Sequence, residues 1–152
     1  MQIHVLAIGR ARGDPAQALF DDYSQRLPWP LKLREIVPRG NFTGAALTAR
    51  EGQALLDAVP KGAQVVVLDA SGRETTSEAF ATRMGRWQDE GTPAVAFLIG
   101  GADGHGAKVL EAANFVLSLG AMTWPHKLVR AMLAEQLWRA ASILANHPYH
   151  RA

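Results

Sequence analysis

The chain has no cysteine among its 152 residues. This absence excludes a disulfide framework, an iron–sulfur cluster held by thiolates and a thiol nucleophile, and it fits a reducing compartment. No apolar run approaches the roughly 20 residues that a helix needs to span a bilayer. The first eight residues also lack the basic start, long apolar stretch and small-residue cleavage site of a signal peptide. We therefore expect a soluble, cytoplasmic protein.

An excess of one charge is also missing, because 16 Lys and Arg residues stand against 14 Asp and Glu residues, a net charge of +2. The basic residues nevertheless outnumber the acidic ones in residues 126–152. The charged residues there are Lys127, Arg130, Glu135, Arg139 and Arg151, and the segment also holds the histidines His126, His147 and His150. A local basic surface favours a polyanionic partner. Cations attracted by the dipole at the end of a helix would give the same pattern, and charge alone does not choose between the two.

Apolar runs alternate with helical patterns along the whole chain, which is typical of a Rossmann-like α/β fold with a largely parallel sheet and helices on both faces. Strands are predicted at about residues 2–8, 31–37, 64–68, 95–99 and 115–118. Helices are predicted at about residues 15–26, 44–58, 77–90, 107–113 and 125–145. No repeat, low-complexity stretch or long linker divides the chain. We expect a single domain over residues 1–152.

Two proline signals mark the predicted helices. Asp14 and Pro15 supply an N-cap and a first-turn proline, and Gln17 stands where a capping-box partner would. Pro125 opens the longest predicted helix, whose apolar residues recur at helical spacing. Packing into the core explains that stripe most simply. Its width, together with Trp138, leaves room for a contact between subunits.

Ligands of open α/β sheets bind beyond the carboxyl ends of the strands. Three segments follow such ends here: the residues after Leu68, a glycine-rich segment that begins at Gly100, and residues 119–125. Glycine allows a backbone to approach a ligand closely, so these segments suit a pocket built from main-chain hydrogen bonds. Any single glycine could equally serve a tight turn. We expect the three segments to converge on one small-molecule pocket.

Common phosphate and metal motifs do not fit this chain. Residues 100–106 do not give G-x-G-x-x-G, and residues 101–106 have Walker A spacing but continue with Ala107 where lysine is required. His147 and His150 are separated by a proline-containing tail segment without a nearby carboxylate pair or cysteine, so no metal site is expected. No G-x-S-x-G elbow occurs either. A dinucleotide, a nucleoside triphosphate and serine–histidine catalysis are all disfavoured.

Several stretches together resemble a known family. They are LDASG (residues 68–72) followed by TSEAFA (residues 76–81), LIGGADG (residues 98–104), LSLGAMTWPH (residues 117–126) and the ending NHPYHR (residues 146–151). Their order and spacing resemble the RlmH family of SPOUT methyltransferases over essentially the whole chain. The resemblance implies a C-terminal trefoil knot, one of the rare exceptions to unthreaded topology, and a homodimer. It also implies methylation, with S-adenosylmethionine, of N3 of a pseudouridine in 23S ribosomal RNA of the large subunit or the assembled ribosome.

The resemblance also assigns residues. The implied cofactor contacts are Leu68, Gly100, Gly120, Ala121, Met122, Thr123, Trp124 and Pro125. Some members have serine at the position of Gly120, so a hydroxyl contact is lost there, and Arg10 stands where lysine is more usual. For RNA binding we expect Tyr149 to stack on a base, Arg151 to meet a phosphate, and Arg130 and Arg139 to contribute from the long helix.

Methylation of an imide nitrogen requires only a modest base, and three histidines are candidates: His126, His147 and His150. The sequence does not choose among them. A small domain offers little surface to a structured RNA, so we expect a site shared between subunits. The alternatives are a SPOUT methyltransferase of another rRNA or tRNA nucleotide, and a noncatalytic ribosome-associated RNA-binding protein.

Overall fold

Every predicted strand and helix forms in the computed structural model, which describes residues 1–151. The strands are β1 (Gln2–Ile8), β2 (Leu31–Ile36), β3 (Gln64–Glu74), β4 (Ala94–Ile99) and β5 (Phe115–Ser118). The helices are α1 (Pro15–Gln25), α2 (Gly44–Asp57), α3 (Ser77–Asp89), α4 (Ala107–Ala112) and α5 (His126–Leu144). All strand pairs are parallel, in the order β2-β1-β4-β3-β5.

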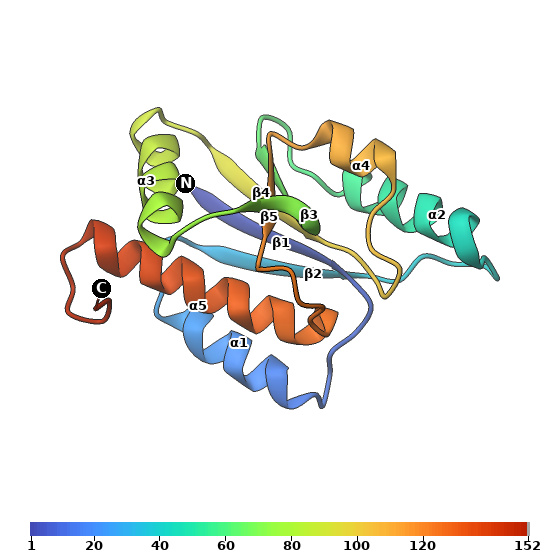
Figure 1. Ribbon diagram of the computed structural model, residues 1–152, viewed down its shortest axis with the longest axis horizontal. Helices are drawn as coiled ribbons and strands as arrows, with labels where there is room; N and C mark the ends of the chain where they lie inside the picture. Colours follow the sequence, from blue (N-terminus) through green and yellow to red (C-terminus); the bar gives the residue numbers. More distant parts are fainter. Residues whose placement is uncertain (152) are drawn as a thin grey trace.

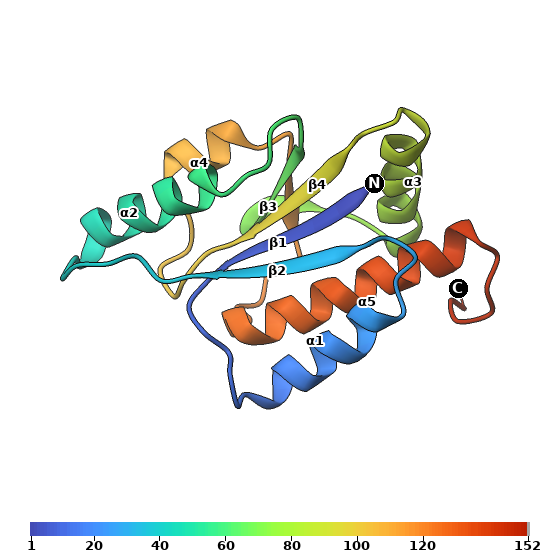
Figure 2. The ribbon, with the colours of Figure 1, turned by 180° about the vertical axis from the view of Figure 1, so that it is seen from behind.

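Helices cover both faces of the sheet, as predicted (Figure 1). α1, α3 and α5 pack on one face, where Phe20, Met84 and Leu137 join the larger core cluster. α2 and α4 pack on the other face, where Leu55 and Val109 join the smaller cluster. The view from behind shows the same two layers (Figure 2). The α/β architecture of the sequence analysis is therefore confirmed.

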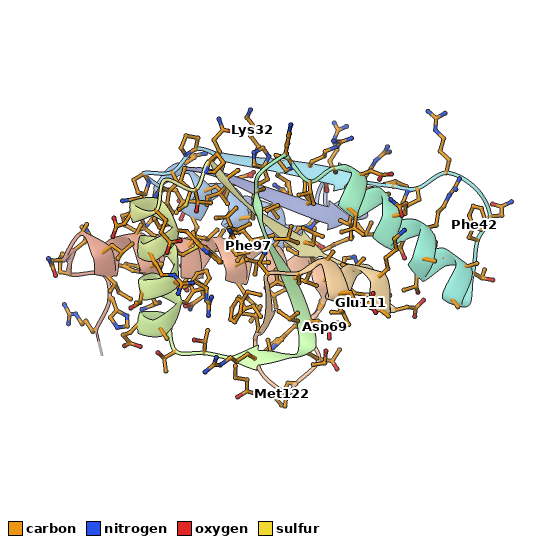
Figure 3. The ribbon with its side chains drawn as sticks, turned by 90° about the horizontal axis from the view of Figure 1, so that it is seen from above. Lys32, Phe42, Asp69, Phe97, Glu111 and Met122 are labelled. Carbon is orange, nitrogen blue, oxygen red and sulfur yellow. The ribbon has the colours of Figure 1, made fainter. Side chains whose placement is uncertain are left out.

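The centre of the sheet is β4, which lies between β1 and β3. All six residues of β4 are buried, and Phe97 has no exposed surface (Figure 3). Strands covered by helices on both faces need continuous apolar runs, which explains why this segment shows no alternation. The buried middle of the sheet holds the carboxyl ends of β3, β4 and β5 in fixed positions.

β3 extends further than predicted. We expected the strand to end at Leu68 and residues 69–74 to form a loop, whereas the strand continues to Glu74. Its pairing with β4 stops at Leu68, and its register with β5 then shifts, so that both Leu68 and Arg73 lie opposite Leu117. The extension leaves the core, and most of its residues are exposed, so no apolar pattern marked it.

The termini of two helices depart slightly from the prediction. The Asp14 side chain caps α1 by accepting a hydrogen bond from the Ala16 amide at 2.9 Å. Gln17 does not complete a capping box, because its side chain donates to Asp21 instead. α5 begins at His126, with Pro125 as its N-cap residue. Asn146 follows the helix in a left-handed conformation with φ of 54°, which turns the chain back toward α5.

The tail after α5 and the loop before α5 lie at opposite ends of this helix, as both ribbon views show (Figures 1 and 2). With 19 residues at 1.5 Å each, the two ends of the helix are about 28 Å apart. Within residues 1–151, none of the helices combines the length and the apolar character needed to cross a membrane. The trefoil knot stays a prediction.

Candidate active site

The three predicted segments meet around one cavity of about 200 Å³ at the carboxyl ends of β3, β4 and β5. Its lining consists of Leu68, Asp69, Ala70, Ile99, Gly100, Gly101, Ala102, Gly104, His105, Leu117, Leu119, Gly120, Met122, Thr123, Trp124, His126 and Val129. Asp69 and Met122, from two of these segments, lie at the same side of the molecule (Figure 3). Six of the eight expected cofactor contacts line this cavity; Ala121 and Pro125 do not.

Glycine shapes the wall that follows β4. A Cβ atom on Gly100 would lie 3.0 Å from the carbonyl oxygen of Gly104, and one on Gly101 would lie 2.7 Å from a carboxylate oxygen of Glu51. Gly104 donates from its amide to the carbonyl of Gly101 at 3.1 Å and has a φ of +73°. The turn is thus compact, and its three glycines bring backbone atoms to the cavity wall.

The loop that follows β5 is held by hydrogen bonds where it begins and is exposed further along. The buried hydroxyl of Ser118 donates to the Gly120 carbonyl at 3.1 Å and accepts from the Gly120 amide at 3.2 Å. Gly120 has a φ of +111° and open space where a Cβ would stand. Met122 and Trp124 are 75% and 40% exposed. The loop therefore presents apolar side chains to solvent beside the cavity.

His126 lies in the cavity wall at the first residue of α5. Its Nε2 atom lies 3.7 Å from the position that a Cβ of Gly9 would take. Burial lowers its pKa below the ordinary value, positive charge on Arg130 and Lys127 lowers it further, and Asp14 partly opposes both effects. The imidazole is therefore neutral near pH 7 and able to accept a proton.

His105 is a cavity residue that the sequence analysis missed. Burial lowers its pKa, although Asp69 and the backbone groups of Leu98 and Leu68 favour the protonated form. Its Nε2 atom is buried without a hydrogen-bond partner. The one signal in the sequence was a histidine placed inside a segment otherwise rich in glycine.

Comparison with known proteins identifies the family. A model for the family described as Predicted SPOUT methyltransferase matches residues 1–150. Ribosomal RNA large subunit methyltransferase H of Paramagnetospirillum magneticum is 53% identical over 151 residues, covering 99% of each chain. The protein of the same name from Rhodospirillum centenum is 51% identical over 152 residues, covering 100% of each chain. The chain belongs to the RlmH family of SPOUT methyltransferases. It is a methyltransferase, as the resemblance implied.

A solved structure has a similar fold. The structure of a probable methylase family protein from Haemophilus influenzae superposes with a TM-score of 0.61. The alignment covers 99% of this chain and 70% of the other, at 11% sequence identity. At that identity the likeness concerns the fold alone. It is consistent with the α/β layers described above.

In this SPOUT methyltransferase the C-terminal tail folds back onto its own helices. The Tyr149 hydroxyl donates to Glu135 at 3.0 Å, and the Tyr149 ring packs 5.8 Å from the ring of Trp138. His150 Nε2 lies 2.9 Å from a carboxylate oxygen of Glu78 on α3. Burial and hydrogen bonds raise the pKa of Tyr149. The tail is therefore an ordered part of the α5 surface.

The candidate bases fall into two groups. His126 lines the cavity, whereas His147 and His150 lie beyond the other end of α5. His147 packs against Trp138, with ring centres 5.5 Å apart. One chain thus brings only His126 of these three to the cavity, and the tail histidines could reach such a cavity only in a second subunit.

The expectation that Arg130 contacts RNA is corrected by its burial. Its side chain is 1% exposed and donates to Glu35 at 2.7 Å and to the carbonyls of Gly9 and Ile8 at 3.0 and 3.2 Å. Glu35 in turn accepts from the Ala11 amide at 2.7 Å. Arg130 therefore binds the start of α5 to the loop after β1, and its guanidinium has no surface left for a phosphate.

The other expected RNA contacts remain near the surface. Arg151 is exposed, and Arg139 is partly exposed, paired with Glu135 and positioned 5.0 Å over the Tyr149 ring. Among residues 1–151, no group of three His, Cys, Asp or Glu side chains is placed to hold a metal ion.

Proposed function

We propose that this methyltransferase uses S-adenosylmethionine to methylate N3 of a pseudouridine in the ribosomal RNA of the large subunit. The observation that carries the proposal is the glycine-walled cavity at the carboxyl ends of β3, β4 and β5, with a neutral histidine, His126, in its wall. The relatives named Ribosomal RNA large subunit methyltransferase H, 53% and 51% identical over the full chain, support the choice of RNA.

The residues around the cavity fit S-adenosylmethionine. Gly120 leaves open space where a side chain would stand, the turn at Gly100 is too tight for a side chain, and the buried Nε2 of His105 lacks a protein partner. Leu68 and residues 119–125 complete a lining of backbone groups and apolar side chains, which suits an adenosine moiety. When bound, this cofactor supplies an activated methyl group on a sulfonium centre.

The chain's own contribution is orientation and proton removal. The fixed ends of three buried strands position the cavity walls, so that proximity lowers the barrier to transfer. Of the three candidate histidines, only His126 lines the cavity of its own chain. We therefore assign it as the acceptor of the N3 proton. Arg130 and Glu35 hold the first turn of α5, which carries His126, in place.

A homodimer would complete the site. A cavity of about 200 Å³ is smaller than the roughly 300–1,000 Å³ that encloses a small ligand, so the ligand extends past the exposed Met122 and Trp124. A groove of about 530 Å³ between α1, α3 and α5 borders the cavity at Leu117, Leu119 and Gly120. Its rim includes Leu19, which is 45% exposed. A second copy seated there would cover apolar surface and bring a tail to the cavity.

The tail is the proposed RNA-facing part of the partner. Tyr149 offers an aromatic face to an unpaired base, and Arg151 and Arg139 offer positive charge to phosphates. Arg10, exposed in the loop after β1, adds positive charge at the same edge of the sheet as the cavity. RNA would therefore be held by one subunit while the other subunit binds the cofactor.

Methyl transfer from labelled S-adenosylmethionine tests the proposal. The enzyme is incubated separately with ribosomes, isolated large-subunit RNA and transfer RNA. We expect label in ribosomal RNA of the large subunit. Label in transfer RNA or in another rRNA would point to a different SPOUT activity, and absence of both cofactor binding and transfer would leave a noncatalytic RNA-binding role.

A further inference from the structure

The turn after β4, residues 100–106, carries two ionisable side chains. Asp103 is exposed, whereas His105 lines the cavity. Its Cε1 atom lies 3.1 Å from where a Cβ of Gly100 would stand, so the ring lies against the Gly100 backbone. The ring also lies at the point where β3 and β4 separate, since their pairing ends at Leu68 and Ile99. It therefore contacts two of the walls that define the site.

The surroundings of His105 provide no compensating ion pair. Its Nε2 is buried without a hydrogen-bond partner, and none of its atoms forms a salt bridge within residues 1–151. The ionisable groups on the neighbouring elements are Asp69 of β3, Glu51 of α2, Lys108 of α4, His126 of α5 and, in its own loop, Asp103. Asp69 favours the protonated ring, but burial has the larger effect and keeps the ring neutral near pH 7.

We propose that His105 makes the cavity selective by charge: the neutral ring admits the sulfonium of S-adenosylmethionine, and the protonated ring disfavours it but still admits the uncharged thioether of S-adenosylhomocysteine. The inference rests on the proposed cofactor. Two positive charges in one cavity repel, and at the dielectric of a partly buried site the repulsion corresponds to roughly tenfold or more in affinity. Acidification would therefore raise the relative affinity for the product.

Calorimetry with both ligands on the full chain tests this. The dissociation constants of S-adenosylmethionine and S-adenosylhomocysteine are measured at about pH 8 and at the lowest pH at which the chain stays folded. Both ligands carry the same titrating amino acid and adenine groups. The pH dependence that these groups cause cancels when one dissociation constant is divided by the other. For the wild type we expect this ratio to rise toward S-adenosylhomocysteine as the pH falls through the lowered pKa of His105, by up to roughly tenfold.

Three variants assign the effect. His105→Leu should give a smaller rise than the wild type between the two pH values, because only His126 of the two cavity histidines can then gain charge. His4→Gln is the matched control. His4 lies near the amino end of β1, at the end of the strands opposite the cavity, so this variant should behave as the wild type. His126 lines the same cavity and also gains charge in acid, so His126→Gln should retain only the part of the rise that comes from His105. A rise of wild-type size in His105→Leu, or one that vanishes in His126→Gln, would overturn the inference and leave the proposed function untouched.

A measurement on the wild type removes any dependence on the folding of His105→Leu. The Cε1 proton of His105 is followed by NMR in the two complexes as pH falls. Its pKa should be lower with S-adenosylmethionine than with S-adenosylhomocysteine. Equal pKa values in both complexes would contradict the inference. Failure of both ligands to bind at either pH would contradict the proposed function itself.

Discussion

At the scale of single residues, Gly100 controls the space in the cavity. A Cβ atom there would lie 3.0 Å from the Gly104 carbonyl oxygen and 3.1 Å from His105 Cε1, closer than ordinary contact. We predict that Gly100→Ala forces the turn into the cavity and weakens S-adenosylmethionine binding by about tenfold or more, without unfolding the chain. Calorimetry and a thermal melt measure the two effects.

Gly106 provides the matched control in the same loop. A Cβ atom on Gly106 would meet only the Thr48 side chain, at an ordinary 3.7 Å. Gly106→Ala should therefore leave cofactor affinity unchanged. Equal affinities for Gly100→Ala and Gly106→Ala would remove Gly100 from the proposed site.

His126 carries the second prediction, which concerns pH. Its pKa is lowered, chiefly by burial, and only the neutral ring accepts a proton. Single-turnover methylation at saturating cofactor should therefore be at its plateau above the lowered pKa and fall about tenfold per pH unit below it. His126→Gln should lower the plateau by roughly 10²-fold or more and abolish this dependence. A variant with an unchanged profile would exclude His126 as the base.

The sequence indicated which glycines line the cavity but not which polar side chains are buried. The glycines of the cavity were found because their role follows from having no side chain. Arg130 was misjudged, because its partner Glu35 lies 95 residues earlier in the chain and only the fold brings the two together. His105 was missed for the same reason: its burial against β3 and β4 is a tertiary property.

At the scale of elements, Arg130 joins α5 to β1 and β2. Removing a buried cation leaves Glu35 and two backbone carbonyls without their partner, so Arg130→Met should lower the free energy of unfolding by roughly 3 kcal/mol. Arg26→Met is the control, since Arg26 forms an exposed pair with Asp22 and should change stability by less than about 1 kcal/mol. Urea denaturation measures both.

The difference in the free energy of unfolding between wild type and Arg130→Met should depend on pH because of Glu35. The hydrogen bond from Arg130 lowers its pKa, so the stabilisation is present above the ordinary carboxyl pKa and is lost as pH falls through the lowered value. The gap between wild type and Arg130→Met should therefore narrow in acid. If the difference in the free energy of unfolding did not change with pH, the Arg130–Glu35 pair would stabilise the fold through packing alone.

The tail yields the next prediction at this scale. Truncation after Ala145 removes the contacts of Tyr149 with Glu135 and Trp138 but leaves the cavity of the same chain intact. Binding of S-adenosylmethionine should persist, since the lining of the cavity of the same chain includes no residue of 146–151. Methylation of ribosomes should fall below detection. Methylation at the wild-type rate would exclude the tail from RNA recognition.

Elements were predictable where hydrophobic pattern and burial agree. The boundaries of β1, β4 and β5 follow from apolar runs, to within a residue. The second half of β3 was read as a loop, because residues 69–74 are mainly polar and exposed, and their strand geometry comes from pairing with β5. Pairing across the sheet is not visible in a local pattern.

At the scale of the whole molecule, the proposed dimer predicts complementation. Subunits truncated after Ala145 are mixed, by refolding together, with full-length subunits that carry Gly100→Val. If each site takes its cofactor wall from one chain and its tail from the other, half of the dimers are mixed and each has one intact site. About one quarter of wild-type activity should return. Activity that stays at background would indicate that each chain supplies its own tail.

The layers of the molecule followed from the sequence, but its assembly did not. Alternating strands and helices specify a parallel sheet covered on both faces, and the carboxyl ends of its strands specify where a ligand binds. The approach of a second chain depends on surface shape, such as the groove that includes Leu19. The threading of the chain likewise depends on contacts that no periodicity encodes.

The most direct measurement maps the methylated nucleotide. Ribosomes lacking this modification are treated with the enzyme and labelled S-adenosylmethionine, and the ribosomal RNA is digested and analysed by mass spectrometry. A parallel sample uses ribosomes whose RNA contains uridine in place of the target pseudouridine. The account predicts one methyl group on N3 of a pseudouridine in large-subunit RNA, and markedly less product in the parallel sample. Methylation of a ribose, of another base or of transfer RNA would contradict it.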